Sequence, residues 1–258
     1  MGRERFDIGV RAARAFSLVE LLVVIAVLAT IAGLLLPALG RSMAMARQFR
    51  CQVSLRSVGF DFGVFADEAL HGDRGADKSL GPRFRVETFQ ESEYGIDEFW
   101  RWGDVNAHTV PDADDNDPMR CAAVKGLVML RRGTPCRQGA VTPSENISYT
   151  FNGRLDRAPR GSNESRWMQA TLTPDAASES MVPLAFDVDG AEAERRGVTP
   201  VFSAPGLGVD RGPFAGDALW FPSYRHAGSS NVLFTDQHVE SSRALVDEKL
   251  WRWDFLPR

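Results

Sequence analysis

Motifs that mark enzymes are missing from this sequence. Its 258 residues contain no P-loop, no dinucleotide-binding glycine fingerprint and no nucleophile elbow. No serine or cysteine has a nearby base in the sequence that singles it out as a covalent nucleophile. We therefore expect a protein that is not an enzyme.

A strongly basic surface is also missing. The chain has 30 lysine and arginine residues against 34 aspartate and glutamate residues, which gives a formal net charge of −4. A surface with this balance does not concentrate nucleic acid around it, so we predict no nucleic-acid partner. The charge is uneven, however, because residues 1–15 carry four arginines against one aspartate and one glutamate.

Cysteine is scarce. The three cysteines are Cys51, Cys121 and Cys136, and an odd number always leaves one thiol unpaired. In an exported domain a disulfide is permitted but not required. Closing the loop from Cys121 to Cys136 would stabilise the fold by about 3 kcal/mol. This pair is the candidate disulfide, and two buried free thiols are the alternative.

One long apolar run dominates what is present. Residues 21–36 are apolar apart from Thr30 and Gly33. With their apolar neighbours they reach about 20 residues, which is the length that spans a bilayer. The basic leader before the run predicts a cytoplasmic N-terminus and an exported remainder. A cleaved secretory signal is the alternative, but the run is longer than the apolar core of such a signal.

The boundary between the leader and the run carries a motif. In RAARAFSLVE (residues 11–20), the basic leader ends at the small Ala15, Phe16 follows, and Glu20 comes four residues later. This resembles the prepilin signature of type IV pilins and type II secretion pseudopilins, in which a prepilin peptidase cuts between a small residue and phenylalanine. The resemblance implies cleavage between Ala15 and Phe16 and methylation of the new N-terminus. It extends to Pro37, because the family commonly has a proline at this spacing.

The resemblance implies a structural function in a filament. Such proteins are single-pass inner-membrane subunits with a cytoplasmic N-terminus and a periplasmic head. Their implied partners are the prepilin peptidase, other pilin or pseudopilin subunits and an inner-membrane assembly platform. Glu20 is expected to meet the cationic N-terminus of a neighbouring subunit, because an unpaired carboxylate in a membrane is costly. Pro37, four residues after Gly33, is a position where the helix is expected to bend or loosen.

A helical period continues beyond the apolar run. Residues spaced alternately by four and three positions form a stripe on one helix face. This stripe consists of Cys51, Leu55, Val58, Phe62 and Phe65. We predict one helix over residues 16–67, and a buried thiol at Cys51.

The whole chain is predicted to have an α+β fold. A long N-terminal helix, transmembrane in its first half, packs on a C-terminal antiparallel β-sheet head, as in pilins. The predicted domains are a cytoplasmic leader (1–15), a transmembrane and filament-core half of the helix (16–39), an amphipathic half that packs on the head (40–67), and a periplasmic head (68–258). Within the head we predict strands at 147–152, 182–188, 231–235 and 238–241, and loops at 157–166 and 190–222.

Three further stretches resemble pseudopilin-like proteins. RHAGSSNVLFTDQHVE (225–240) resembles a C-terminal motif of such proteins, abundant in planctomycetes, in which a histidine is followed after nine residues by Asp-Gly. Here Gln237 stands in place of the glycine. The other two are CQVSLRSVGFDFGVFADE (51–68) and SYTFNGRL (148–155). The nearest resemblance is to the major pseudopilins of type II secretion, and a minor or tip subunit remains the alternative.

Two groups of side chains are candidate metal ligands. The first consists of Asp112, Asp114 and Asn116. The second consists of His226, Asp236 and His238. The first group alternates as in a calcium loop, but the glycine and glutamate that complete such a loop are missing. The second group is a usual ligand set, and a hydrogen-bonded structural hairpin is its alternative interpretation. We predict no cofactor, with calcium as the alternative.

Three other functions compete with the filament subunit. The first is a signal-anchored periplasmic binding protein that does not polymerise. The second is an adhesin or DNA-uptake pilin, which needs a basic or aromatic surface on its head. The third is a metal-dependent hydrolase, which needs bound metal.

Overall fold

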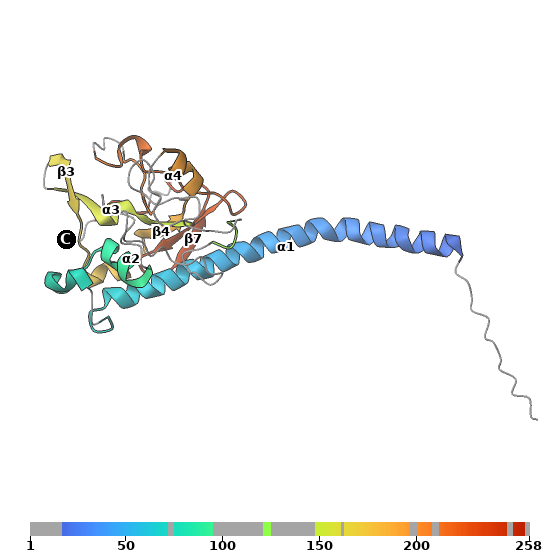
Figure 1. The fold of residues 1–258 in the computed structure, drawn as a ribbon, viewed down its shortest axis with the longest axis horizontal. Coiled ribbons are helices and arrows are strands. Elements are labelled where there is room, and N and C mark those ends of the chain that lie inside the picture. Colours follow the sequence, from blue (N-terminus) through green and yellow to red (C-terminus); the bar gives the residue numbers. More distant parts are fainter. Residues whose placement is uncertain are drawn as a thin grey trace, which may run out of the picture. The chain divides into compact units, whose positions relative to one another are not determined.

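The structure is a computed structural model that describes most of the chain. The described residues are 17–71, 75–94, 121–124, 148–160, 163–196, 201–207, 212–246 and 250–255. The chain divides into two compact units, Met1–Met43 and Ala44–Arg258. The first unit contains the start of the long helix α1, and the second contains the rest of α1 and the head (Figure 1).

The helix α1 (Leu18–Ala66) runs without interruption for 49 residues. The predicted stripe is confirmed, since Cys51, Leu55, Val58, Phe62 and Phe65 are all fully buried. The exposed side chains Phe49, Val53 and Phe60 lie off this stripe. In the second unit, α1 therefore packs on the head through a single apolar face, as its sequence period requires.

A five-stranded sheet forms the centre of the head. Its strands are β1 (Tyr149–Asn152), β4 (Pro183–Asp187), β5 (Phe202–Ser203), β6 (Ser230–Phe234) and β7 (Val239–Ser242). Their order is β5-β1-β4-β6-β7, and every pairing is antiparallel except that of β1 with β5. The α+β fold class is thus confirmed, with one parallel pair in an otherwise antiparallel sheet.

Both faces of this sheet are covered. On one face the stripe of α1 packs against Tyr149, Phe151 and Leu184. On the other face Phe186, Phe234 and Trp253 form a second cluster. Strands buried on both faces read as continuous apolar runs rather than as an alternation. Trp253, near the C-terminal end of the described residues, is 3% exposed within this second cluster.

The hairpin between β6 and β7 approaches α1 closely. Its turn places Gln237 at φ 76°, so glutamine adopts here the left-handed conformation that glycine adopts most easily. A Cβ added at Gly59 would lie 2.8 Å from Leu233 Cδ1 and 3.1 Å from Gln237 Cα. The absence of a side chain at Gly59 therefore lets the turn pack directly against the helix.

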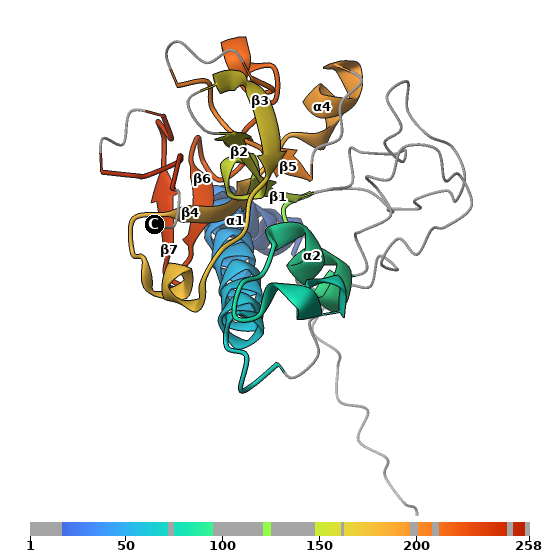
Figure 2. The ribbon, with the colours of Figure 1, turned by 90° about the vertical axis from the view of Figure 1, so that its left-hand side faces the viewer.

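Several described elements were not predicted from the sequence. The helix α2 (Val86–Tyr94) packs beside the end of α1, where the rings of Phe62 and Phe89 lie 5.4 Å apart (Figure 2). The predicted loop at 157–166 is wrong, because β2 (Arg157–Arg160) and β3 (Asn163–Gln169) pair as a two-stranded ribbon. The predicted excursion at 190–222 contains α4 (Gly190–Arg196) and β5.

Short helical turns complete the described elements. They are η1 (Gly75–Leu80), α3 (Gly153–Asp156), η4 (Pro174–Ser178) and η5 (Ala215–Asp217). The turn α3 follows β1 directly, and Asn152 caps it by accepting a hydrogen bond from the amide N–H of Arg154 over 3.1 Å. Such a cap satisfies an amide that the first turn leaves without a partner.

Candidate functional site

The start of α1 is held by a capping box. The Glu20 carboxylate accepts a hydrogen bond from the Ser17 amide over 2.9 Å, and the Glu20 amide donates to the Ser17 hydroxyl over 3.2 Å. This reciprocal pair satisfies two amides that the first turn leaves open. Glu20 therefore has a partner within its own chain, in addition to any that a neighbouring subunit could supply.

The surface of α1 from Leu18 to Leu39 is apolar all round. Its large side chains are exposed, from 48% at Val24 and Ile31 to 80% at Leu18. Glu20 is the single charged residue between Leu18 and Gly40. A helix that is apolar on every face belongs inside a bundle or a membrane. Among the described helices, α1 alone is long and apolar enough to cross a bilayer, which makes it compatible with a membrane anchor.

The helix continues through Pro37. Residues on both sides of this proline are helical, although proline removes one hydrogen bond of the helical ladder. The chain is therefore helical at Pro37 in this structure, and the bend or loosening expected there stays a prediction. A Cβ added at Gly33, which lies four residues earlier, would meet no atom within 4 Å.

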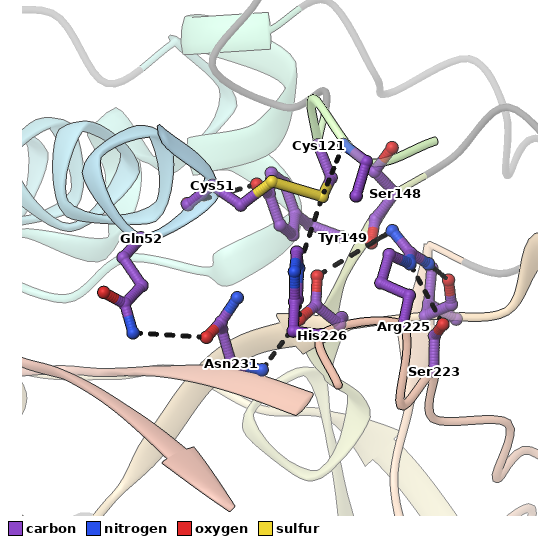
Figure 3. The surroundings of a disulfide bond; sticks show 12 residues. Cys51, Gln52, Cys121, Ser148, Tyr149, Ser223, Arg225, His226 and Asn231 are labelled. Atoms are coloured by element: carbon purple, nitrogen blue, oxygen red, sulfur yellow. Dashed lines mark hydrogen bonds and ion pairs between the residues drawn. A yellow bond between two sulfur atoms is a disulfide. The ribbon is translucent and has the colours of Figure 1, made fainter. Parts of the chain in front are cut away.

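The head carries a disulfide that joins α1 to a distant segment. Cys51 and Cys121 are bonded, with their Cα atoms 5.0 Å apart and a sequence separation of 70 positions (Figure 3). The predicted pairing of Cys121 with Cys136 is wrong, because Cys121 is already bonded to the helix. Cys51 is buried as predicted, but as half of a disulfide and not as a free thiol. Cys136 lies outside the described residues.

A buried histidine and aspartate adjoin the disulfide. His226 Nε2 lies 3.4 Å from Cys121 Sγ and 3.4 Å from Asp187 Oδ2. Asp187 is fully buried at the end of β4, and its Oδ2 accepts a hydrogen bond from the Asn231 amide over 2.7 Å. No motif in the sequence marks Asp187, the last residue of the apolar strand β4, as a partner of His226.

Polar contacts around the disulfide hold α1 on the sheet. The Tyr149 hydroxyl donates to the Cys51 carbonyl over 3.2 Å. The Gln52 amide group donates to Ser241 Oγ over 3.0 Å and reaches Asn231 Oδ1 over 3.4 Å (Figure 3). These bonds tie one turn of α1 to β1, β6 and β7, because Tyr149, Asn231 and Ser241 lie on those three strands.

The second predicted metal group is not assembled. His226 lies beside the disulfide, whereas His238 contacts Asp236 through Nδ1 and lies 3.5 Å from Glu240 through Nε2. The ring of His238 also stacks on Phe234 with centroids 4.2 Å apart. Asp236 and His238 therefore stabilise the hairpin, which is the alternative given above.

Other predicted site residues fall on parts that the structure does not describe. These are Ala15, Phe16, Asp112, Asp114 and Asn116. The predicted cut site and the predicted calcium loop therefore stay predictions.

A buried carboxyl that sequence reasoning missed lies at the end of α3. Asp156 is 3% exposed and contacts Arg157 Nε over 3.1 Å. Burial raises the pKa of Asp156 to about 6, while the charge of Arg157 lowers it and that of Glu87 raises it. The carboxyl therefore takes up a proton in the folded protein more readily than in water.

Residues 10–36 match the model of the prokaryotic N-terminal methylation motif. The match includes the predicted cut site, the capping box and most of the apolar part of α1. It supports a prepilin-type signal at the N-terminus. No curated protein and no solved structure matches the chain.

Proposed function

We propose that this chain is a prepilin-like structural subunit. Prepilin peptidase cuts it between Ala15 and Phe16, and the product assembles with other pilin or pseudopilin subunits on an inner-membrane platform. The filament is a type II secretion pseudopilus or a type IV pilus-like fibre. The observation that carries this proposal is the match of residues 10–36 to the methylation motif, on a helix whose apolar side chains are exposed.

The exposed helix supports a function in assembly. About 22 residues at 1.5 Å each give roughly 33 Å, which is the thickness of a bilayer core. Before assembly, lipid covers these side chains. In a filament, the same side chains pack against helices of other subunits, so apolar surface stays out of water in both states.

Glu20 contributes a charge that assembly can use. Cleavage creates an ammonium group on Phe16, and a neighbour's ammonium can pair with the Glu20 carboxylate. In a medium of low dielectric constant such a pair is favourable when the two charges match and costly when one is missing. We propose that this pairing selects the correct stagger between neighbouring subunits.

The capping box supports a second candidate, a signal-anchored protein that does not polymerise. Ser17 already gives the Glu20 carboxylate a partner within the chain, so a membrane anchor could retain Glu20 for helix capping alone. The two candidates differ in what they require of Glu20. Assembly requires its charge, whereas capping requires a hydrogen-bond acceptor.

The first test is mass spectrometry of the N-terminus after co-expression of the full chain with a prepilin peptidase. We expect a mature chain that begins with an N-methylated Phe16. The matched control is Phe16→Ala with the leader intact. A wild-type chain that keeps Met1, or is cut further downstream, would overturn the proposal.

The second test separates charge from capping. Glutamine can accept at the third helical position of a capping box, so Glu20→Gln removes the charge and keeps the cap. Ser17→Ala removes the hydroxyl half of the cap and keeps the charge. We expect Glu20→Gln to insert in the membrane but to lose cross-linkable polymers, whereas Ser17→Ala still polymerises. Polymers that persist unchanged in Glu20→Gln would contradict the proposed pairing.

A further inference from the structure

Three side chains of the kind that bind metals converge in the head. Cys51 Sγ, Cys121 Sγ and a ring nitrogen of His226 lie within 4.8 Å of one another. The two cysteines are fully buried and the histidine is 4% exposed. They come from α1, from residues 121–124 and from the turn before β6, so the fold brings together three distant parts of the chain (Figure 3).

The cluster is not arranged for nucleophilic catalysis. A cysteine–histidine–aspartate relay uses both ring nitrogens, one toward the thiol and the other toward the acid. Here Cys121 and Asp187 both approach the same atom, His226 Nε2, over 3.4 Å each. One nitrogen cannot serve both partners in a relay. A single cation, in contrast, can bind all the atoms that meet at this point.

We propose that the dithiol form of this chain binds a zinc-class divalent cation through Cys51, Cys121 and His226, with the Asp187 carboxylate as fourth ligand. Two thiolates, one imidazole and one carboxylate are donors that zinc accepts in tetrahedral geometry. Sulfurs at about 2.3 Å from zinc lie roughly 3.8 Å apart. With the Cα atoms 5.0 Å apart, side-chain rotation after reduction can bring the sulfurs to this spacing.

The state of Asp187 is a second observation that points to a cation. The carboxylate is fully buried, and its Oδ1 has no hydrogen-bond partner among the described residues. The nearest cationic group is Arg225 Nη1, at 3.8 Å from that oxygen. Burying a carboxylate without a full set of partners is costly. The oxygen that faces His226 is Oδ2, at 3.4 Å from Nε2, so a cation between the two residues would neutralise the buried carboxylate charge through Oδ2.

Metal and disulfide exclude each other at this site. A cation needs both sulfurs as thiolates, whereas the disulfide uses both in a covalent bond. Ribosomes incorporate cysteine as a thiol, so every copy of the chain passes through the dithiol form before the bond closes. The cation would hold α1 on the sheet in that interval. This inference does not rest on filament assembly.

The test uses the full-length chain in detergent with Co²⁺ as a spectroscopic probe. A trialkylphosphine reduces the disulfide to two thiols and is oxidised to the phosphine oxide, with one water supplying the oxygen and the two protons. After removal of the phosphine under nitrogen, Co²⁺ is titrated in. We expect one Co²⁺ per chain, with thiolate charge-transfer bands and the visible bands of a tetrahedral site. The unreduced chain should show none, and Zn²⁺ should displace the bound Co²⁺.

Two variants make the test specific. Oxidised His226→Ala keeps both cysteines, so its disulfide and circular dichroism verify folding before reduction. After reduction we expect it to bind Co²⁺ at least about tenfold more weakly. Cys136→Ser, the matched thiol control, should bind as the wild type does. No binding by the reduced wild type, equal binding by His226→Ala, or loss of binding in Cys136→Ser would each overturn the proposal.

Discussion

Removing the disulfide gives the sharpest prediction for the stability of the head. The double variant Cys51→Ala/Cys121→Ala opens a loop that joins positions 70 residues apart. In the chain-entropy model, closing a loop of this length stabilises the folded state by about 4 kcal/mol, compared with about 3 kcal/mol for a 15-residue loop. We therefore expect the free energy of unfolding to fall by about 4 kcal/mol.

Urea denaturation of the full chain in detergent, followed by tryptophan fluorescence, measures this loss. With a denaturant slope of about 2 kcal/mol per molar urea, the midpoint should fall by about 2 M. Trp253 lies in the core of the head and reports its unfolding. The control is Cys136→Ala, which should leave the midpoint unchanged. A fall below about 0.5 M in the double variant, or an equal fall in the control, would refute the reasoning.

Two further predictions concern buried side chains. Phe62→Ala should destabilise the head by about 3–5 kcal/mol, because the Phe62 ring packs against Phe84 and Phe89. The control is Phe60→Ala, at an exposed position, which should change stability by less than about 0.5 kcal/mol. Equal losses of stability in urea denaturation of the two variants would contradict the packing of Phe62. The pKa of Asp156 is raised by burial to about 6 from 3.8, so the folded state binds its proton more tightly than the unfolded state. Stability should therefore fall by up to about 3 kcal/mol as the pH rises from 4 to 6, and a thermal-unfolding profile of Asp156→Asn should lack this component.

Periodicity made the long helix predictable from the sequence. The stripe from Cys51 to Phe65 repeats at helical spacing, and each of its members is buried. The hairpin at Asp236 and Gln237 was also predictable, because two alternating strands flank a short polar turn. In both cases neighbours in sequence determine the structure.

The disulfide was not predictable, because its pairing depends on tertiary contacts. Cys121 lies 15 residues from Cys136 and 70 from Cys51, and spacing alone favoured the shorter loop. The contact between Asp187 and His226 was not predictable for the same reason, because the two residues are distant in sequence. The ribbon of β2 and β3 was missed because its strands are polar and show no alternating apolar face.

Glu20 illustrates a signal that was present but interpreted differently. Ser17 and Glu20 have the spacing of a capping box, and the structure forms it. Because Glu20 lies at the edge of an apolar run, its carboxylate was expected to pair with a cationic group of another subunit. A local bond and an intermolecular pair are compatible uses of one carboxylate.

The close contact at Gly59 has a mechanical consequence. Leu233 and Gln237 leave no room there for a side chain, and the covalent bond at Cys51 lies two turns away on the same helix. Tension along this part of α1 is therefore resisted both by the close packing of Gly59 on β6 and its following turn and by the disulfide to Cys121. Sliding of α1 over the sheet would therefore require the turn at Gln237 to move first.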